Sequence, residues 1–139
     1  MYTLEEIAAL RQEIIARKLD TPELWGALTN EDLQKWCNGC GPERFPEFVR
    51  FGLSHLLGRY AAAFAIHDID YMFAGKRDAD SRMRSNMLKI WRKDFGIWRY
   101  LSKPGLLNRL IVIPLVWAMV STAGDSAYRE AQKEGGGNG

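Results

Sequence analysis

Apolar residues recur at intervals of three and four along most of the chain, a spacing typical of amphipathic α-helices. The first run begins at a capping box formed by Thr3 and Glu6 and predicts a helix that continues to about Lys18. Thr21-Pro22 and Thr29-Asn30 are two further helix starts, because each offers an N-cap hydroxyl. The N-terminal third is therefore predicted to consist of short helices.

A second apolar run predicts a central helix from about Leu56 to Phe73, with Gly75 ending it in a left-handed cap. After a short turn at Gly75-Lys76-Arg77, a third run continues to about Tyr100. Its large apolar members are Met83, Met87, Ile90, Trp91 and Trp98. Two helices joined by so short a turn are expected to form an antiparallel pair.

The last predicted helix runs from about Leu106 to Lys133, with Pro114 as a kink or true start and Gly124 as a point of close packing. No alternating pattern long enough for a strand is present in the sequence. The expected fold is therefore an all-α, small helical domain with a central antiparallel helix pair. We divide the chain into one domain over 1–134, comprising an N-terminal helical extension over 1–35 and a core over 36–133, and a flexible tail over 135–139.

The composition fits one soluble domain with a hydrophobic core, since 47% of the 139 residues are hydrophobic and 26% are charged. The first residues lack a basic stretch followed by an apolar run, so no cleaved secretion signal is expected. The longest apolar stretch, Leu110 to Val120, is interrupted by Pro114 and is shorter than the roughly 20 residues that span a bilayer. No transmembrane helix is therefore predicted.

The net charge of +2 conceals a strongly basic segment. From Lys76 to Arg109 the chain carries ten Lys or Arg residues against three Asp. Such a segment attracts anions, and phospholipid headgroups and nucleic acid both qualify electrostatically. The alternative interpretation is a solvated face of one helix.

The sequence His67-Asp68-Ile69-Asp70-Tyr71 on the central helix is the strongest candidate for chemistry. A separation of four residues puts His67 and Tyr71 on one face, and Asp68 is rotated from His67 by about 100°. A histidine can accept a proton from water near neutral pH, and the neighbouring carboxylate can hold a hard cation. Two functions can therefore be served from adjacent faces of one helix.

A histidine that acts as a general base needs a partner to orient its ring. Asp80, near the start of the helix that folds back, is our candidate, and Asp78 is assigned as the N-cap of that helix. The two roles could be exchanged.

A glycine-containing loop precedes this histidine, with the sequence Cys37-Asn38-Gly39-Cys40-Gly41-Pro42. The loop, then His-Asp-x-x-Tyr on a helix, then an Asp on an antiparallel helix resembles the active-site plan of the phospholipase A2 family. The resemblance extends over about Trp36 to Asn86. The small residues Ala61-Ala62-Ala63, just before the motif, resemble those at the same place in the viral and microbial branches of the family. The whole arrangement looks most like small bacteriophage or prophage proteins of this kind.

The resemblance implies a calcium-dependent hydrolase that cleaves the acyl esters of phospholipids, with His67 as general base and Tyr71 donating to Asp80. It implies Ca²⁺ bound by the carbonyls of Cys37, Gly39 and Gly41 and by the carboxylate of Asp68. The implied partners are a phospholipid membrane surface and phage structural proteins, in a phage virion or the cytoplasm of a bacterial host, with no specific nucleic acid. The disulfides of the secreted enzymes are absent, so packing must hold the helix pair.

Other interpretations remain open for the same residues. His67 taken alone fits a buried histidine whose hydrogen bonds are satisfied within the core, and Cys37-x-x-Cys40 fits a redox pair or, with His55 and His67, a zinc site. The chain also fits a non-catalytic phage structural or accessory protein that binds partners or membrane through a basic, aromatic helical face. An enzyme requires an open hollow at His67, whereas in a binding protein that place can be filled.

Overall fold

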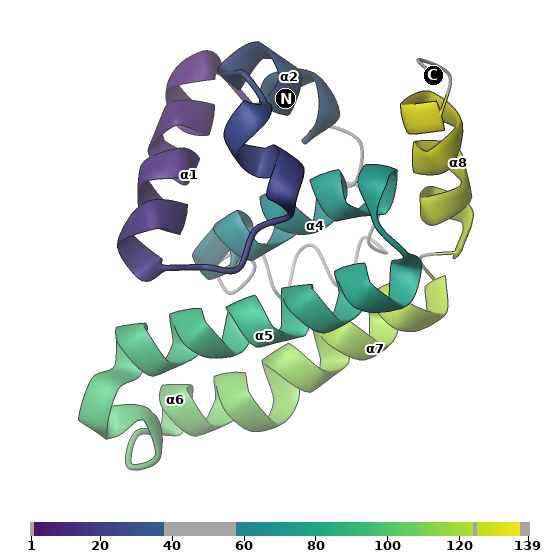
Figure 1. Ribbon diagram of the computed structural model, residues 1–139. Helices are drawn as coiled ribbons and strands as arrows, with labels where there is room; N and C mark the ends of the chain where they lie inside the picture. The colour runs from purple at the N-terminus through teal and green to yellow at the C-terminus, as the bar shows by residue number, and fades with distance from the viewer. Residues whose placement is uncertain (1, 38–57, 124, 137–139) are drawn as a thin grey trace.

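The computed structural model describes residues 2–37, 58–123 and 125–136, and every regular element in these ranges is helical (Figure 1). The all-α prediction is confirmed. In order, the elements are α1 (Leu4–Arg17), η1 (Glu23–Ala27), α2 (Asn30–Trp36), α4 (Ala61–Phe73), α5 (Lys76–Phe95), η3 (Gly96–Arg99), α6 (Lys103–Leu107), η4 (Asn108–Val112), α7 (Ile113–Ala123) and α8 (Asp125–Gly136). The helix α4 lies between α1 and α2 on one side and α5 on the other, and α6 and α7 run along the far side of α5.

Two of the predicted helix starts are confirmed. The Thr3 hydroxyl accepts the Glu6 amide at 3.1 Å while the Glu6 carboxylate accepts the Thr3 amide at 2.7 Å, so the capping box is complete. Thr29 caps α2 in the same way. The start predicted at Thr21 is wrong, because the 3₁₀ turn η1 follows Pro22 and has no side-chain cap.

The helices α4 and α5 form the antiparallel pair that the sequence predicts. Residues close to the turn contact each other, as Tyr71 does with Asp80, and residues far from it on both sides also do, as Arg59 does with Asp94. This order of contacts is that of an antiparallel pair. The turn itself differs from the prediction. Gly75 has φ of −70° and is the N-cap of α5, so it forms no left-handed cap, and α5 begins at once at Lys76.

Asp78 consequently lies in the first turn of α5 and is not its N-cap, which corrects the sequence assignment. Its carboxylate is still favourably placed, because the partial positive charge at a helix N-terminus attracts an anion.

The core combines small side chains of α4 with large ones of the helices around it. Three alanines of α4 (Ala62, Ala63 and Ala65) are buried in the same cluster as bulky residues of α1 and α5. The largest fully buried side chains include Ile7, Leu33, Ile66, Ile69, Met83, Met87, Ile90 and Trp91. Buried alanines allow helix backbones to approach closely, so α1 and α5 both pack on α4.

Buried polar residues fix how the N-terminal helices and the C-terminal helices join the pair. Asn86 of α5 is fully buried, and its side-chain amide accepts from the Asp20 amide and donates to the Asp20 carbonyl, both at 2.8 Å. Each backbone group of Asp20 thereby gains the partner that it lacks outside a helix. The connection after α1 is held against α5 by this reciprocal pair.

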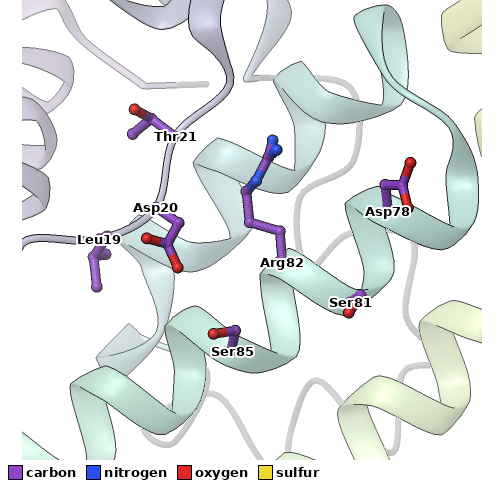
Figure 2. Close-up of a pocket in the computed structure, with 7 residues that line it drawn as sticks. All are labelled: Leu19, Asp20, Thr21, Asp78, Ser81, Arg82 and Ser85. Atoms are coloured by element: carbon purple, nitrogen blue, oxygen red, sulfur yellow. The ribbon is translucent and has the colours of Figure 1, made fainter.

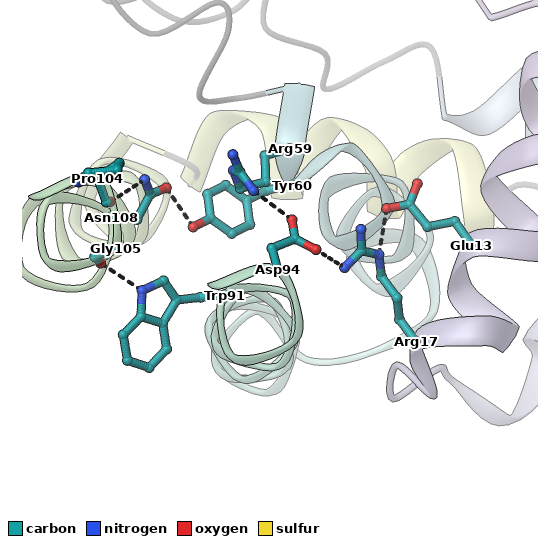
Figure 3. A network of polar contacts seen from close by, with 9 residues as sticks. All are labelled: Glu13, Arg17, Arg59, Tyr60, Trp91, Asp94, Pro104, Gly105 and Asn108. Carbon is teal, nitrogen blue, oxygen red and sulfur yellow. Dashed lines mark hydrogen bonds and ion pairs between the residues drawn. The ribbon is translucent and has the colours of Figure 1, made fainter. Parts of the chain in front are cut away.

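A second polar network links four helical elements (Figure 3). Asp94 of α5 pairs with Arg17 of α1 at 2.5 Å and with Arg59, just before α4, at 2.8 Å. Nearby, the Tyr60 hydroxyl donates to the buried Asn108 side chain at 2.7 Å, and Asn108 in turn donates to the Pro104 carbonyl at 2.9 Å. The packing of α6 against the helix pair thus depends on specific hydrogen bonds as well as on apolar contact.

Pro114 does not end the helix that contains it. The segment Asn108–Val112, just before it, adopts a π-helical turn, after which the Ile113 amide donates to the Asn108 carbonyl. A proline in a regular α-helix lacks one donor and clashes with the carbonyl four residues earlier, so a wider turn just before it relieves the conflict. Helical backbone therefore continues from α6 through α7.

This continuity makes the apolar helix longer than the sequence predicts. Lys103–Thr122 is a helical segment of 20 residues with a mean hydropathy of 1.6, long and apolar enough by length and composition to cross a membrane. The sequence estimate stopped at Pro114, where the helix does not stop. Only 28% of its most apolar window is buried within the protein.

The single final helix predicted from Leu106 to Lys133 is instead divided among α6, η4, α7 and α8. Gly124, expected as a point of close packing, lies outside the described residues. The helix α8 turns away from α7 and lies beside α4 (Figure 1). Its Gln132 amide donates to the carbonyls of Tyr71 and Met72, at 2.9 and 3.3 Å, and the Tyr128 hydroxyl donates to the Ala74 carbonyl at 3.2 Å. These carbonyls lie at the end of α4, where a helix leaves acceptors unsatisfied, so α8 caps α4.

Candidate functional site

Three residues singled out in the sequence come together between α4 and α5. His67 Nε2 lies 2.9 Å from Asp80 Oδ1, and the Tyr71 hydroxyl donates to the same oxygen at 2.9 Å. His67 and Asp80 are 4% and 5% exposed, and Tyr71 is buried as well. Of the two carboxylates considered as the partner of His67, the structure places Asp80 there, and Asp78 is exposed on the first turn of α5.

Lys76 completes the surroundings of Asp80, and the sequence prediction did not include it. The Lys76 ammonium donates to Asp80 Oδ2 at 3.0 Å and to the Ser121 carbonyl of α7 at 2.8 Å. Lys76 and Asp80 are four residues apart on one helix, a spacing at which opposite charges pair, so the sequence did contain this signal. The contact with Ser121 depends on tertiary structure and had no local signal.

The hydrogen bonds determine the charge of Asp80. Burial alone would raise the pKa of this carboxyl, but the hydrogen bonds from His67, Lys76 and Tyr71 together outweigh burial and hold its pKa below the ordinary value. Asp80 is therefore ionised at neutral pH and can only accept hydrogen bonds. It follows that the proton between the two residues belongs to His67 Nε2.

Burial disfavours the charged imidazolium and so lowers the pKa of His67. This effect exceeds that of the hydrogen bond and charge of Asp80, which would raise the pKa. The imidazole is consequently neutral near pH 7. With the proton on Nε2, Nδ1 is the basic atom of the ring. The described part of the chain gives Nδ1 no hydrogen-bond partner. The arrangement thus holds a neutral histidine in one tautomer with its other nitrogen available to accept a proton.

Aromatic contacts restrain the same residues. The rings of His67 and Tyr71 lie 4.0 Å apart between centroids, and Tyr128 of α8 contacts the Tyr71 ring edge-to-face at 5.4 Å. The side chain that orients Asp80 is therefore itself held in place by a helix more than fifty residues later in the chain.

The residues expected to bind calcium are only partly within the described residues. Asp68 is on α4 and 5% exposed, and Cys37 follows directly after α2, whereas Gly39 and Gly41 lie outside the described residues. The Asp68 carboxylate lies near Tyr2, whose pKa is raised by burial first and then by that charge. No residue of the N-terminal segment was expected at this site, and the contact between Tyr2 and Asp68 had no signal in the sequence.

Calcium binds six to eight oxygen atoms. Across residues 2–37, 58–123 and 125–136, no group of three His, Cys, Asp or Glu side chains could hold a metal ion, and Asp68 is the one carboxylate that the resemblance assigns. The described side chains do not by themselves form a calcium site.

The zinc and redox interpretations involve Cys40 and His55, which also lie outside the described residues. Cys37 is buried, and its sulfur lies 3.6 Å from the Ala65 carbonyl of α4. This contact is that of a small apolar residue packed in a core.

A buried ion pair on the other side of α5 involves the second acid of the motif. Asp70 is 0% exposed and pairs with Arg82, and burial raises its pKa to about 6 despite the opposing effect of Arg82. Figure 2 shows the Arg82 side chain extending from α5 toward α4, at the edge of a hollow of about 680 Å³ that Asp20 and Asp78 also line. Arg82 is neutralised by Asp70 and Asp20 pairs with Lys89 at 2.7 Å, so among the charged residues of the lining Asp78 alone has no ion pair in the described part of the chain.

No family model, curated protein or solved structure matches this chain. The functional inference therefore rests on the geometry of the site together with the resemblance of its residues given above.

Proposed function

We propose that the protein hydrolyses acyl ester bonds of phospholipids in a calcium-dependent reaction of the phospholipase A2 type, with His67 as the general base. The observation that carries this proposal is the contact of His67 Nε2 with Asp80 Oδ1 at 2.9 Å, with Tyr71 on the same oxygen. A histidine that is neutral, is fixed in one tautomer by a buried carboxylate and has no hydrogen-bond partner at its other nitrogen among the described residues has the properties of a general base.

In the proposed reaction, His67 Nδ1 takes a proton from a water molecule whose oxygen forms a bond to the ester carbonyl carbon. Asp80 stabilises the imidazolium that results, and Lys76 and Tyr71 keep Asp80 ionised and oriented. When the carbon–oxygen bond of the ester breaks, the proton passes from the imidazolium to the leaving alkoxide. The products are a fatty acid and a lysophospholipid.

Calcium would supply a Lewis acid for the developing oxyanion when bound. Asp68, adjacent to His67 and on a neighbouring face of α4, is the carboxylate that would bind it.

Fatty acid release from anionic phospholipid vesicles tests the proposal, measured in calcium and in chelator. Native protein should release fatty acid only with calcium. His67→Gln should lower the rate by about 10²- to 10⁴-fold, the usual contribution of a general base, and Asp68→Asn should abolish the calcium-dependent release. Two matched controls are His55→Gln, the other histidine, and Asp78→Asn, an exposed aspartate outside the site.

Circular dichroism establishes that each variant is folded, so that a loss of rate has a chemical meaning. Folded native protein that releases no fatty acid under any of these conditions would contradict the proposal. Equal losses in His55→Gln and His67→Gln would also contradict the role given to His67.

A second candidate function is non-catalytic binding to a membrane or a partner through a basic, aromatic face. The observation that favours it is the exposure of large apolar side chains after α5, with Ile97, Trp98 and Leu101 at 77%, 62% and 75% exposed and Leu110 at 66%. Aromatic and aliphatic side chains next to Lys and Arg are typical of surfaces that lie on anionic lipid.

Co-sedimentation with anionic vesicles tests this second function. Replacing Trp98 and Leu101 by Ser should weaken vesicle binding, whereas Leu24→Ser, at an exposed leucine of η1, should leave it unchanged. Binding that persists in the double variant would exclude this face as the contact surface.

A further inference from the structure

A hollow between α5 and α7 has a lining of unusual charge. It measures about 540 Å³ and is bounded by Lys76, Arg77, Asp80, Ser81, Arg84, Trp117 and Ser121. Three of these residues are cations and one is an anion. The anion is Asp80, whose charge is already compensated by the hydrogen bonds from Lys76, His67 and Tyr71. An electrostatic excess of positive charge therefore remains in the hollow.

Two of the cations have no carboxylate partner in the described part of the chain. Arg77 and Arg84 are both exposed, and neither forms an ion pair there. The Arg84 guanidinium instead lies 5.5 Å from the centre of the Trp117 ring. A cation held over an aromatic face loses less conformational freedom when it binds an anion, and its hydrogen-bond donors remain available.

Ser121 adds a neutral donor to the same lining. Its hydroxyl is buried and has no hydrogen-bond partner in the described structure, although its backbone carbonyl accepts from Lys76. Buried hydroxyls are almost always hydrogen-bonded, so an unsatisfied one on a residue that lines the same hollow as Arg77 and Arg84 is a candidate donor to a bound group. Such a group must be compact and rich in oxygen to reach both kinds of donor.

We propose that this hollow is a binding site for a phosphate group, held by Arg77 and Arg84 and by the hydroxyl of Ser121. Guanidinium groups bind phosphate oxygens through paired hydrogen bonds. A phosphate group carries more oxygens and more charge than a carboxylate, so it matches two arginines better. The hollow of Figure 2, which shares Ser81 with this one, offers a contrast, because its Arg82 is already paired with the buried Asp70.

The phosphate can come from a phospholipid headgroup or from a free phosphate ester. The headgroup source rests on the proposed function and agrees with the position of Trp117, which lines the hollow and is 37% exposed on the apolar helix α7. The site itself rests on the charge and geometry of the hollow alone.

A ¹⁹F NMR titration of protein labelled with 5-fluorotryptophan tests the proposal. The chain has five Trp residues, so Trp117→Phe assigns the relevant signal. Inorganic phosphate, added at constant ionic strength with chloride as the balancing anion, should shift the Trp117 signal along a saturating curve. Replacing Arg77 and Arg84 together by Gln should weaken binding about tenfold or more, and Ser121→Ala should weaken it by less.

Arg92→Gln is the matched control, because Arg92 is an exposed arginine of the same helix that does not line the hollow. Its dissociation constant should equal that of the native protein. A Trp117 signal that does not respond to phosphate, or a double variant that binds within twofold of the native protein, would overturn the proposal.

Two further arms distinguish the source of the phosphate and separate this site from the proposed enzyme. Displacement of inorganic phosphate by glycerophosphoglycerol, a soluble headgroup diester, supports the headgroup source, and displacement only by phosphate monoesters supports the free source. Saturable phosphate binding without fatty acid release supports the site while the enzyme proposal fails. Fatty acid release with no response of the Trp117 signal supports the enzyme proposal and contradicts the phosphate site.

Discussion

Replacing Asp80 with Asn tests whether the charge of this carboxylate, beyond its shape, holds the candidate site together. The native side chain accepts three hydrogen bonds, from His67 and Tyr71 on one oxygen and from Lys76 on the other, at 2.9, 2.9 and 3.0 Å. Asparagine has one carbonyl oxygen and one NH₂ group. If the oxygen keeps His67 and Tyr71, the NH₂ group faces the Lys76 ammonium, and two donors oppose each other.

The structure sets the expected loss of stability. A hydrogen bond to a charged group contributes about 1.5–3 kcal/mol, and the two bonds that remain become neutral and weaker. Lys76 still donates to the Ser121 carbonyl at 2.8 Å, so it is not left without a partner. We therefore expect Asp80→Asn to lower the free energy of unfolding by about 2–3 kcal/mol, roughly a 30- to 150-fold change in the equilibrium.

Urea denaturation followed by far-ultraviolet circular dichroism measures this difference, with Asp78→Asn as the matched control. Asp78 is exposed in the first turn of the same helix and interacts mainly with the helix N-terminus, so its loss should cost about 1 kcal/mol or less. Because folding lowers the pKa of Asp80, its contribution to stability is present above the ordinary value of about 4 and is lost as pH falls below it. The gap between native protein and Asp80→Asn should close in acid.

A difference below about 0.5 kcal/mol at neutral pH, within the range of ordinary surface substitutions, would refute the reasoning. So would a gap that stays constant into acid, since that result would locate the cost in shape and not in charge.

Three other outcomes are expected from the same structure. Burial lowers the pKa of His67, so its imidazole NMR signals should titrate with a midpoint below about 6.5. The stability that the neutral imidazole contributes should be lost as pH falls from about 6.5 through that midpoint. A midpoint above 6.5 would contradict the lowered pKa. Asn86→Ala should lower the free energy of unfolding by about 1–3 kcal/mol, because both hydrogen bonds to the Asp20 backbone are lost, and an unchanged urea midpoint would show that the pair contributes nothing. Gly96→Ala should lower the free energy of unfolding by about 1–3 kcal/mol through backbone strain, because Gly96 has φ of +50° while nothing lies within 4 Å of an added Cβ. Gly26 is equally unhindered but has an ordinary φ, so Gly26→Ala should change the same free energy by about 0.5 kcal/mol or less. Equal effects of the two substitutions on thermal stability would exclude backbone strain as the cause.

The sequence predicts those features that depend on neighbouring residues. The capping boxes at Thr3 and Thr29 are decided within four residues, and the pairing of His67 and Tyr71 on one face follows from helix geometry alone. The position of Asp80 also follows once a helix is expected to fold back along α4. Local sequence is therefore sufficient for these parts of the fold and of the site.

Other features could not be predicted, because glycine and proline permit several local structures and tertiary contacts choose among them. Gly75 fits the end of one helix as well as the start of the next, and the second proved correct. Choosing the wrong role shifted the expected start of α5 and so made Asp78 appear to be an N-cap. Tyr2 and Tyr128 reach the site from the two ends of the described chain, and no local pattern marks such long-range contacts.

The π-helical turn at Asn108–Val112 sets the rotational phase of the helix that follows it. A π turn accommodates one residue more than an α turn, and each residue advances an α-helix by about 100°. A one-residue deletion in this turn can be absorbed by its conversion to an α turn, which leaves Trp117 and Ser121 at the hollow and Val116 in the core. A deletion at Leu115, inside the regular helix α7, cannot be absorbed and would rotate these three side chains by about 100° relative to the preceding helix. A frame-preserving deletion is thus expected to be milder in the π turn than a few residues later in α7, although both remove one apolar residue from the same helix.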